Sequence, residues 1–302
     1  MGSPALARLP SLSPCLINTS RRNSISPLSI KIARQMDDTE MRSSDTTSAE
    51  RGHHLLDVGR TLSLVHDSPA RESRWAATMV PDFTWDRHGK YGTASEFARR
   101  LAVSGMDVCR FDAEGSGLAG ACGRWPLVPW EAMAEEVCAV ADWVAGRTAA
   151  NARKVLIAVG IGGVPAVSAA ARMRREGHRG APEALVLIGA DLVQSVRFVV
   201  TGMASVRAGE QLAPSRVFRS RERLEPRTEL AALDIPVLCV RGAADPRFAD
   251  PGADLTRFGA VTCVIQNCSD PFEEAVTTRD AASAIQRWID DPQRSKSSTV
   301  LT

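Results

Sequence analysis

Hydrophobic residues between positions 61 and 290 follow two patterns. Short runs that are apolar on both faces, such as 154–160 and 235–242, predict buried strands of a parallel sheet. Apolar residues spaced three to four positions apart, as over 130–147, predict amphipathic helices that pack on such a sheet. Strands are expected at 61–67, 74–80, 106–112, 154–160, 183–191, 235–242 and 261–268, and helices at 96–105, 130–147, 164–175 and 272–289.

This alternation predicts an α/β fold with a mostly parallel central sheet and helices on both of its faces. Parallel strands need crossover connections, and each gap between the predicted strands is long enough for one. Ligands of such sheets bind beyond the carboxyl ends of the strands. We therefore look for a site in the loops at that edge.

The two ends of the chain differ from the middle. Residues 1–36 are rich in Ser, Pro and Arg and contain no Asp or Glu, and residues 37–52 are polar. Such segments bury too little to offset the entropy of ordering. We expect a disordered extension over 1–58, one domain over 59–292, and a disordered tail over 293–302. The acid-free start also resembles an organellar transit peptide; the alternative is an upstream start codon, with Met36 or Met41 as the initiator.

Composition narrows the function classes. The chain has 302 residues, 44% hydrophobic and 24% charged, with a net charge of +2, so nothing favours a nucleic-acid or membrane partner. No apolar run approaches the roughly 18 residues of a membrane-spanning helix. The seven cysteines form no CxxC pair and no metal-binding spacing. We expect a soluble, cytoplasmic protein without a metal or cofactor.

Four segments, in order, resemble the α/β-hydrolase superfamily. Phe111, Asp112, Gly115 and Gly117 match its FDxRGxG loop, and VLIAVGIGG is similar to the strand and turn that carry its nucleophile. IPVLCVRGAADP resembles the strand before its catalytic acid, and VIQNCSDPFEE resembles its histidine loop. The resemblance spans roughly residues 60–290. It implies an α/β-hydrolase-type sheet with a short helical cap formed by the insertion 192–234.

The resemblance also locates the catalytic triad, and two of its three positions are altered. Gly160 stands at the serine of the G-x-S-x-G turn, Asp245 at the acid, and Asp270 at the histidine. Pro81 and Asp82 replace the His-Gly pair of the oxyanion loop, and proline has no N–H to donate. We interpret the chain as a non-catalytic or accessory binding protein of this fold, a pseudoenzyme. The alternative is a hydrolase or acyltransferase for an ester, thioester or amide, with a relocated nucleophile or an activated water.

Three side chains are candidates for relocated chemistry. His88 follows the strand 74–80, Ser116 lies between two glycines, and Cys268 ends the last predicted strand. Each also has a plain interpretation: an exposed loop histidine, a structural loop serine and an unreactive strand-end cysteine. Asp245 and Asp270 could form a carboxylate pair for proton transfer, as in a lyase or isomerase. Their alternatives are a loop brace for Asp245 and a helix cap for Asp270.

Two further features could hold an anion. The turn with Gly160, Gly162 and Gly163 opens a helix, where backbone N–H groups can bind a negative group. The cap contains a basic run, which is either a solvated helix face or a site for a carboxylate, a phosphate or an acidic protein. We therefore keep a small-molecule ligand and an acidic protein as possible partners. The arginines concerned are Arg219, Arg221 and Arg223.

Overall fold

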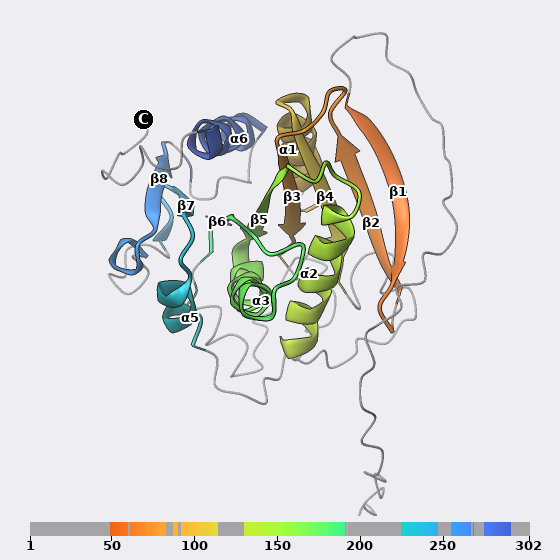
Figure 1. The fold of residues 1–302 in the computed structure, drawn as a ribbon. Helices are drawn as coiled ribbons and strands as arrows, with labels where there is room; N and C mark the ends of the chain where they lie inside the picture. The colour runs from red at the N-terminus through yellow and green to blue at the C-terminus, as the bar shows by residue number, and fades with distance from the viewer. Residues whose placement is uncertain are drawn as a thin grey trace, which may run out of the picture.

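The computed structural model describes eight strands and five α-helices (Figure 1). The residues it describes are 49–59, 61–82, 87–89, 92–113, 130–190, 192, 225–246, 255–266, 268 and 275–290. The strands are β1 (Glu50–Asp57), β2 (Thr61–Ser68), β3 (Trp75–Val80), β4 (Met106–Asp112), β5 (Arg153–Val159), β6 (Ala184–Ile188), β7 (Val237–Gly242) and β8 (Val261–Ile265). The helices are α1 (Thr93–Val103), α2 (Trp130–Ala145), α3 (Gly163–Glu176), α5 (Pro226–Ala232) and α6 (Ala275–Asp290).

All eight strands form a single sheet in the order β1-β2-β4-β3-β5-β6-β7-β8. The pairs β1–β2 and β2–β4 are antiparallel, and every other pair is parallel. The predicted α/β fold with a mostly parallel sheet is confirmed. Because β3 lies between β4 and β5, the loops that follow β3 and β5 meet at the same edge of the sheet.

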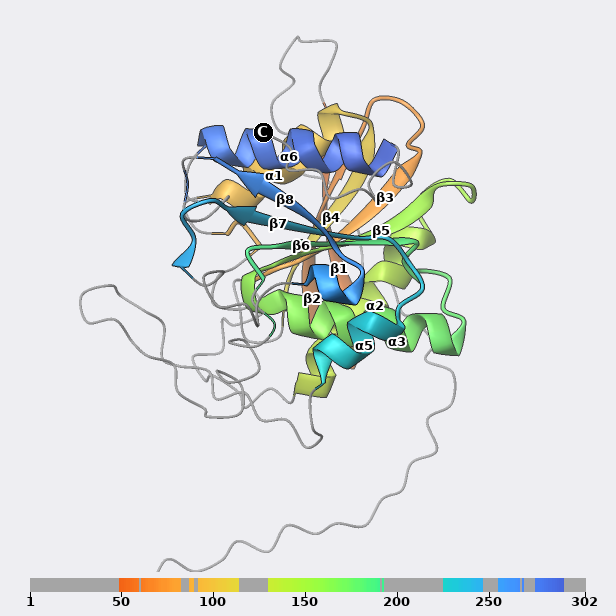
Figure 2. The same cartoon turned by 90° about the vertical axis from the view of Figure 1, so that its left-hand side faces the viewer.

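Helices cover both faces of the sheet (Figure 2). Helices α2, α3 and α5 lie on one face, and α1 and α6 lie on the other (Figures 1 and 2). Strand β5 contributes to the core on both faces of the sheet. Leu156 and Ala158 pack into the core under α2 and α3, while Val155 and Ile157 pack into the core under α1 and α6. A strand that is buried on both faces must be apolar at every position. This explains the continuous apolar run in the sequence.

Strand β1 lies inside the segment that we expected to be disordered. Eight main-chain positions of β1 pair with β2, Leu56 is fully buried, and the Nε of Arg51 donates to Asp67 at 2.6 Å. Most other side chains of β1 are exposed. An edge strand that is ordered mainly by its main-chain hydrogen bonds needs few apolar residues, so its sequence looks like that of a polar tail. The expectation of disorder is therefore wrong for 50–57.

In the described part of the chain, no helix is long and apolar enough to cross a lipid bilayer.

Candidate functional site

The turn after β5 has the backbone shape of a nucleophile elbow. Val159 is extended, Gly160 follows with φ +53°, and the short 3₁₀ helix η3 (Gly160–Gly162) leads directly into α3. A residue with a side chain strongly disfavours such a positive φ. The sharp strand-to-helix turn is therefore kept, with a buried glycine at its apex.

The side chain of Asp82 occupies the space above Gly160. A Cβ built on Gly160 would overlap Oδ2 of Asp82, and it would lie 2.9 Å from Cγ and 3.3 Å from Cβ of the same residue. Asp82 is half-buried and follows the end of β3, which pairs with β5. The carboxylate thus lies where the side chain of an elbow nucleophile would begin. It can accept a proton or bind a cation, but it leaves no room for a serine in this geometry.

The two other glycines of the turn allow close packing. A Cβ on Gly162 would overlap the carbonyl oxygen of Pro81 and lie 3.3 Å from the carbonyl oxygen of Val80. A Cβ on Gly163 would lie 2.8 Å from the Cβ of Ala190. Gly162 therefore allows the end of β3 to pack against the turn, and Gly163 allows Ala190 to do so. The contact at Gly162 brings Asp82 over Gly160.

Asp245 lies at the same edge of the sheet, in the turn after β7. Its side chain is only 6% exposed. The turn is fixed to the end of β8, since the N–H of Ala243 donates to Ile265 at 2.8 Å and the N–H of Ala244 donates to Cys268 at 3.0 Å. A cavity of about 430 Å³ lies beside this turn, lined by Arg241, Gly242, Ala243, Ala244, Asp245, Pro246 and Val264.

Cys268 and His88 already have structural partners. The Sγ of Cys268 is buried and donates to the carbonyl oxygen of Ile265 at 3.5 Å. The ring Nδ1 of the exposed His88 lies 2.9 Å from Oγ of Ser95, and the carbonyl oxygen of His88 accepts the N–H groups of Ala94 and Ser95. His88 therefore supports the start of α1.

A buried ionic network holds the loop after β3. Asp112 accepts the backbone N–H of Arg87 at 2.8 Å and its guanidinium at 2.5 Å. Arg110 donates to Asp67 through two nitrogens, at 3.1 and 3.3 Å, and to the carbonyl oxygen of Arg87 at 2.9 Å. Burial lowers the pKa of Arg110, and the nearby Asp67 opposes this shift. The FDxRGxG-like segment therefore contributes Asp112 as an anchor for the loop that leads from β3 to α1.

Several candidate residues lie outside the part of the chain that the structure describes. They are Ser116, Asp270, Arg219, Arg221 and Arg223, together with most of the cap insertion 192–234. The roles of these residues stay predictions. Of the cap, the structure describes α5, whose Glu229 accepts a hydrogen bond from Ser168 of α3 at 2.7 Å.

Sequence reasoning missed the position of Asp82. The sequence marked Pro81 and Asp82 as an altered oxyanion loop and Gly160 as an altered nucleophile, but it treated the two changes separately. The structure joins them, because the lost side chain at 160 and the acid at 82 share one space. The signal that could have linked them is a second departure from the family pattern on a strand that pairs directly with β5.

Comparison with solved structures gives the fold a name. Dienelactone hydrolase from Anabaena variabilis superposes with a TM-score of 0.57 at 15% identity, covering 80% of this chain and 98% of that one. Est1E from Butyrivibrio proteoclasticus gives 0.57 at 15% over 81% and 98%, and esterase Est22 gives 0.56 at 13% over 81% of each chain. No protein-family model matches the sequence, and no curated protein is similar enough to match it. At this level of identity the likeness concerns the architecture, and on that evidence the chain has the α/β-hydrolase fold.

Proposed function

We propose that the chain is a hydrolase for a small ester or thioester, in which the carboxylate of Asp82 takes the place of the missing serine. The observation that carries the proposal is the position of that carboxylate over Gly160, at the carboxyl edge of the sheet. The solved structures of the same fold support the reaction class, since they include esterases and a dienelactone hydrolase. One of them, Est1E, has been solved with ferulic acid bound.

The proposed step uses Asp82 as a general base. The carboxylate takes a proton from a water molecule as the water oxygen bonds to the carbonyl carbon of the ester. The bond from that carbon to the leaving oxygen or sulfur then breaks, and the proton passes from Asp82 to the leaving group. No covalent intermediate with the protein forms. The backbone N–H of Ile161, the residue after the apex, stands where this fold supplies one donor to the negative oxygen.

A second candidate function is that of a non-catalytic binding protein. It is favoured by Pro81, which has no N–H, at the place where the fold supplies the second oxyanion donor. A carboxylate over the turn would also repel the negative charge that develops during attack on a carbonyl. In this alternative Asp82 fills the former nucleophile position and the protein retains a ligand without converting it.

One set of measurements separates the two candidates. The full chain is assayed with p-nitrophenyl esters, lactones and acyl thioesters, beside the variants Asp82→Asn and Asp234→Asn. Asp234 is an exposed aspartate that precedes β7, and it serves as the control. Hydrolysis through Asp82 predicts that Asp82→Asn lowers kcat/KM by about 100-fold or more, whereas Asp234→Asn leaves it unchanged.

Each other outcome has a definite meaning. Absence of turnover by the wild-type chain, with specific retention of an ester in equilibrium dialysis, supports the binding protein. Turnover that survives Asp82→Asn contradicts the role of Asp82. A serine-directed fluorophosphonate should leave no adduct on the turn 158–162, because none of these residues has a hydroxyl group.

A further inference from the structure

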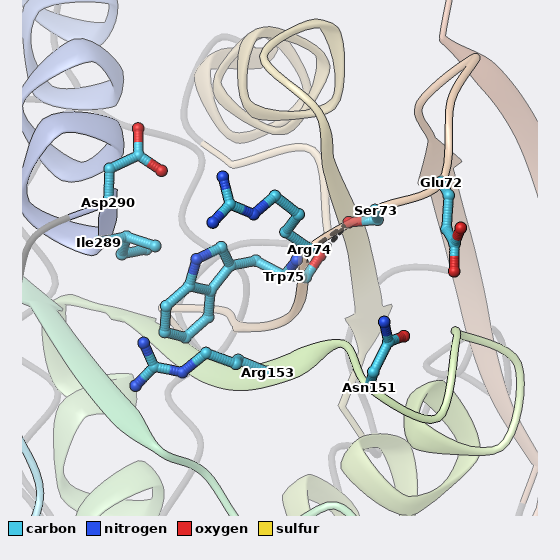
Figure 3. Close-up of a pocket in the computed structure, with 8 residues that line it drawn as sticks. All are labelled: Glu72, Ser73, Arg74, Trp75, Asn151, Arg153, Ile289 and Asp290. Carbon is cyan, nitrogen blue, oxygen red and sulfur yellow. Dashed lines mark hydrogen bonds between the residues drawn. The ribbon is translucent and has the colours of Figure 1, made fainter.

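A second cavity lies at the opposite edge of the sheet from Gly160 (Figure 3). Trp75 and Arg153 are the first residues of β3 and β5 and pair in register, and Ile289 and Asp290 end α6. The cavity measures about 350 Å³, which lies within the usual range for small-molecule sites. Its lining consists of Glu72, Ser73, Arg74, Trp75, Asn151, Arg153, Ile289 and Asp290.

One part of the cavity is positively charged. The guanidinium carbon of Arg153 lies 4.3 Å from the centroid of the Trp75 ring, and its Nε donates to Glu183 at 3.1 Å. These contacts fix the guanidinium plane. Within the described part of the chain, the side chain of Arg74 makes no hydrogen bond or ion pair. In the view of Figure 3, the two guanidinium groups lie on either side of the indole.

The cavity also carries negative charge. Asp290 is the last residue of α6, and the carbonyl groups at a helix C-terminus carry a partial negative charge. Among the described residues, its carboxylate accepts only long hydrogen bonds, from Gln286 at 3.4 and 3.5 Å. Glu72 is a second, exposed carboxylate, and in the view of Figure 3 it lies on the other side of Arg74 and Trp75 from Asp290. A simple anion or a simple cation would therefore meet a like charge in this cavity, whereas a molecule that carries both charges would find a partner for each.

We propose that this cavity binds a free amino acid. Its α-carboxylate pairs with Arg74, since guanidinium groups bind carboxylates in a bidentate manner, while Arg153 stays stacked on Trp75. Its ammonium group pairs with Asp290 and with the end of α6. The site is separate from Asp82 and does not depend on the proposed hydrolysis.

The first test removes the positive charge of Arg74. Isothermal titration of the full chain with each of the twenty standard amino acids, up to about 10 mM, identifies the best binder. Arg74→Gln should weaken its binding about tenfold or more, because a hydrogen bond between charged groups is lost. The variant should keep the Tm of the wild type, since Arg74 has no partner within the described chain. Arg71→Gln is the matched control, because Arg71 is an exposed neighbour that does not line the cavity.

The second test asks whether both charges of the ligand are recognised. The wild type should bind the free amino acid about tenfold or more tightly than its N-acetyl derivative or its amide. Asp290→Asn should abolish the preference over the N-acetyl derivative, whereas Asp280→Asn, on the same helix but outside the cavity, should preserve it. The proposal is overturned if no amino acid binds, if Arg74→Gln binds like the wild type, or if the wild type binds the N-acetyl derivative equally well.

Discussion

At the scale of single residues, the most informative contact joins Gly160 to Asp82. A glycine is needed at position 160 for two separate reasons, its positive φ and the carboxylate above it. In the α/β-hydrolase elbow, the strain of a positive φ is normally tolerated because the residue at the apex presents the nucleophile. Here the Asp82 carboxylate also occupies the space above the apex, so restoring a side chain at position 160 requires a change at Asp82 as well.

Gly160→Ala should therefore destabilise the fold by about 2 to 5 kcal/mol. About 1 to 2 kcal/mol comes from the left-handed backbone and about 1 to 3 kcal/mol from overlap with Asp82. Gly177 is the matched control, since it has φ +72° at the end of α3 and nothing within 4 Å of a built Cβ. Gly177→Ala should show the backbone contribution alone. The free energy of unfolding in urea measures both.

A double-mutant cycle isolates the contact itself. In an Asp82→Ala background the carboxylate is gone, and Gly160→Ala should cost about as much as Gly177→Ala does in the wild type. An equal penalty for Gly160→Ala with and without the carboxylate would show that the overlap adds nothing, and would remove the observation on which the proposed function rests.

At the scale of elements, the hairpin β1–β2 packs its histidines against α2. The ring centroid of His54 lies 4.9 Å from that of Trp143, and the centroid of His66 lies 5.7 Å from it. The guanidinium carbon of Arg147 lies 4.1 Å from the Trp143 ring, and Nε2 of His66 lies 3.3 Å from Asp107. The edge strand β1 is thus held by one aromatic group in addition to its pairing with β2.

This arrangement predicts that stability depends on pH through His54. Burial, and then the nearby Arg147, His66 and His53, lower the pKa of His54 below its ordinary value. The unfolded chain therefore binds a proton more readily than the folded chain does. The stabilisation is complete above about pH 6.5, the ordinary pKa of histidine, and is lost as the pH falls toward the lower pKa of the folded state.

The variant His54→Gln should flatten this dependence. The free energy of unfolding is measured from about pH 7.5 to about pH 5, below the ordinary pKa of the imidazole. The wild type should lose stability over that range faster than His54→Gln does. His53→Gln should change the slope less than His54→Gln does, because His53 is exposed on the same strand and makes the smallest of the named contributions to the lowered pKa of His54. Equal slopes for the wild type and His54→Gln would contradict the prediction.

At the scale of the whole molecule, the sequence predicts the strands that are buried on both faces. It does not predict the features that depend on which strands pair with each other. The strands β5 and β7 are apolar throughout because they are buried on both faces, so their positions were readable. The edge strand β1 was missed because its order comes from main-chain pairing with β2. The overlap of Asp82 with Gly160 was missed because it depends on β3 lying beside β5, a neighbour relation that the order of elements along the chain leaves open.

The sharing of strands between two cores gives a last prediction. Neighbouring residues of β5, β6 and β7 alternate between the layer of α2 and α3 and the layer of α1 and α6, so neither core can open without loosening the same strands. Ile285 of α6 is fully buried, and Ile285→Ala should destabilise the fold by about 2 to 5 kcal/mol. Hydrogen exchange, read by mass spectrometry, should quicken in α2 and α3 as much as in α6.

The matched control for this exchange experiment is Val103→Ala, since Val103 is 48% exposed at the end of α1. Its effect should stay within about 0.5 kcal/mol, because little contact is removed. If Ile285→Ala quickens exchange only in α6 and β8, the two helical layers open independently. Each helical layer could then detach from the sheet without the other. The contact between Asp82 and Gly160, on the side of α3, would be unaffected by changes in α6. Cooperative opening instead ties the proposed site to the packing of both faces.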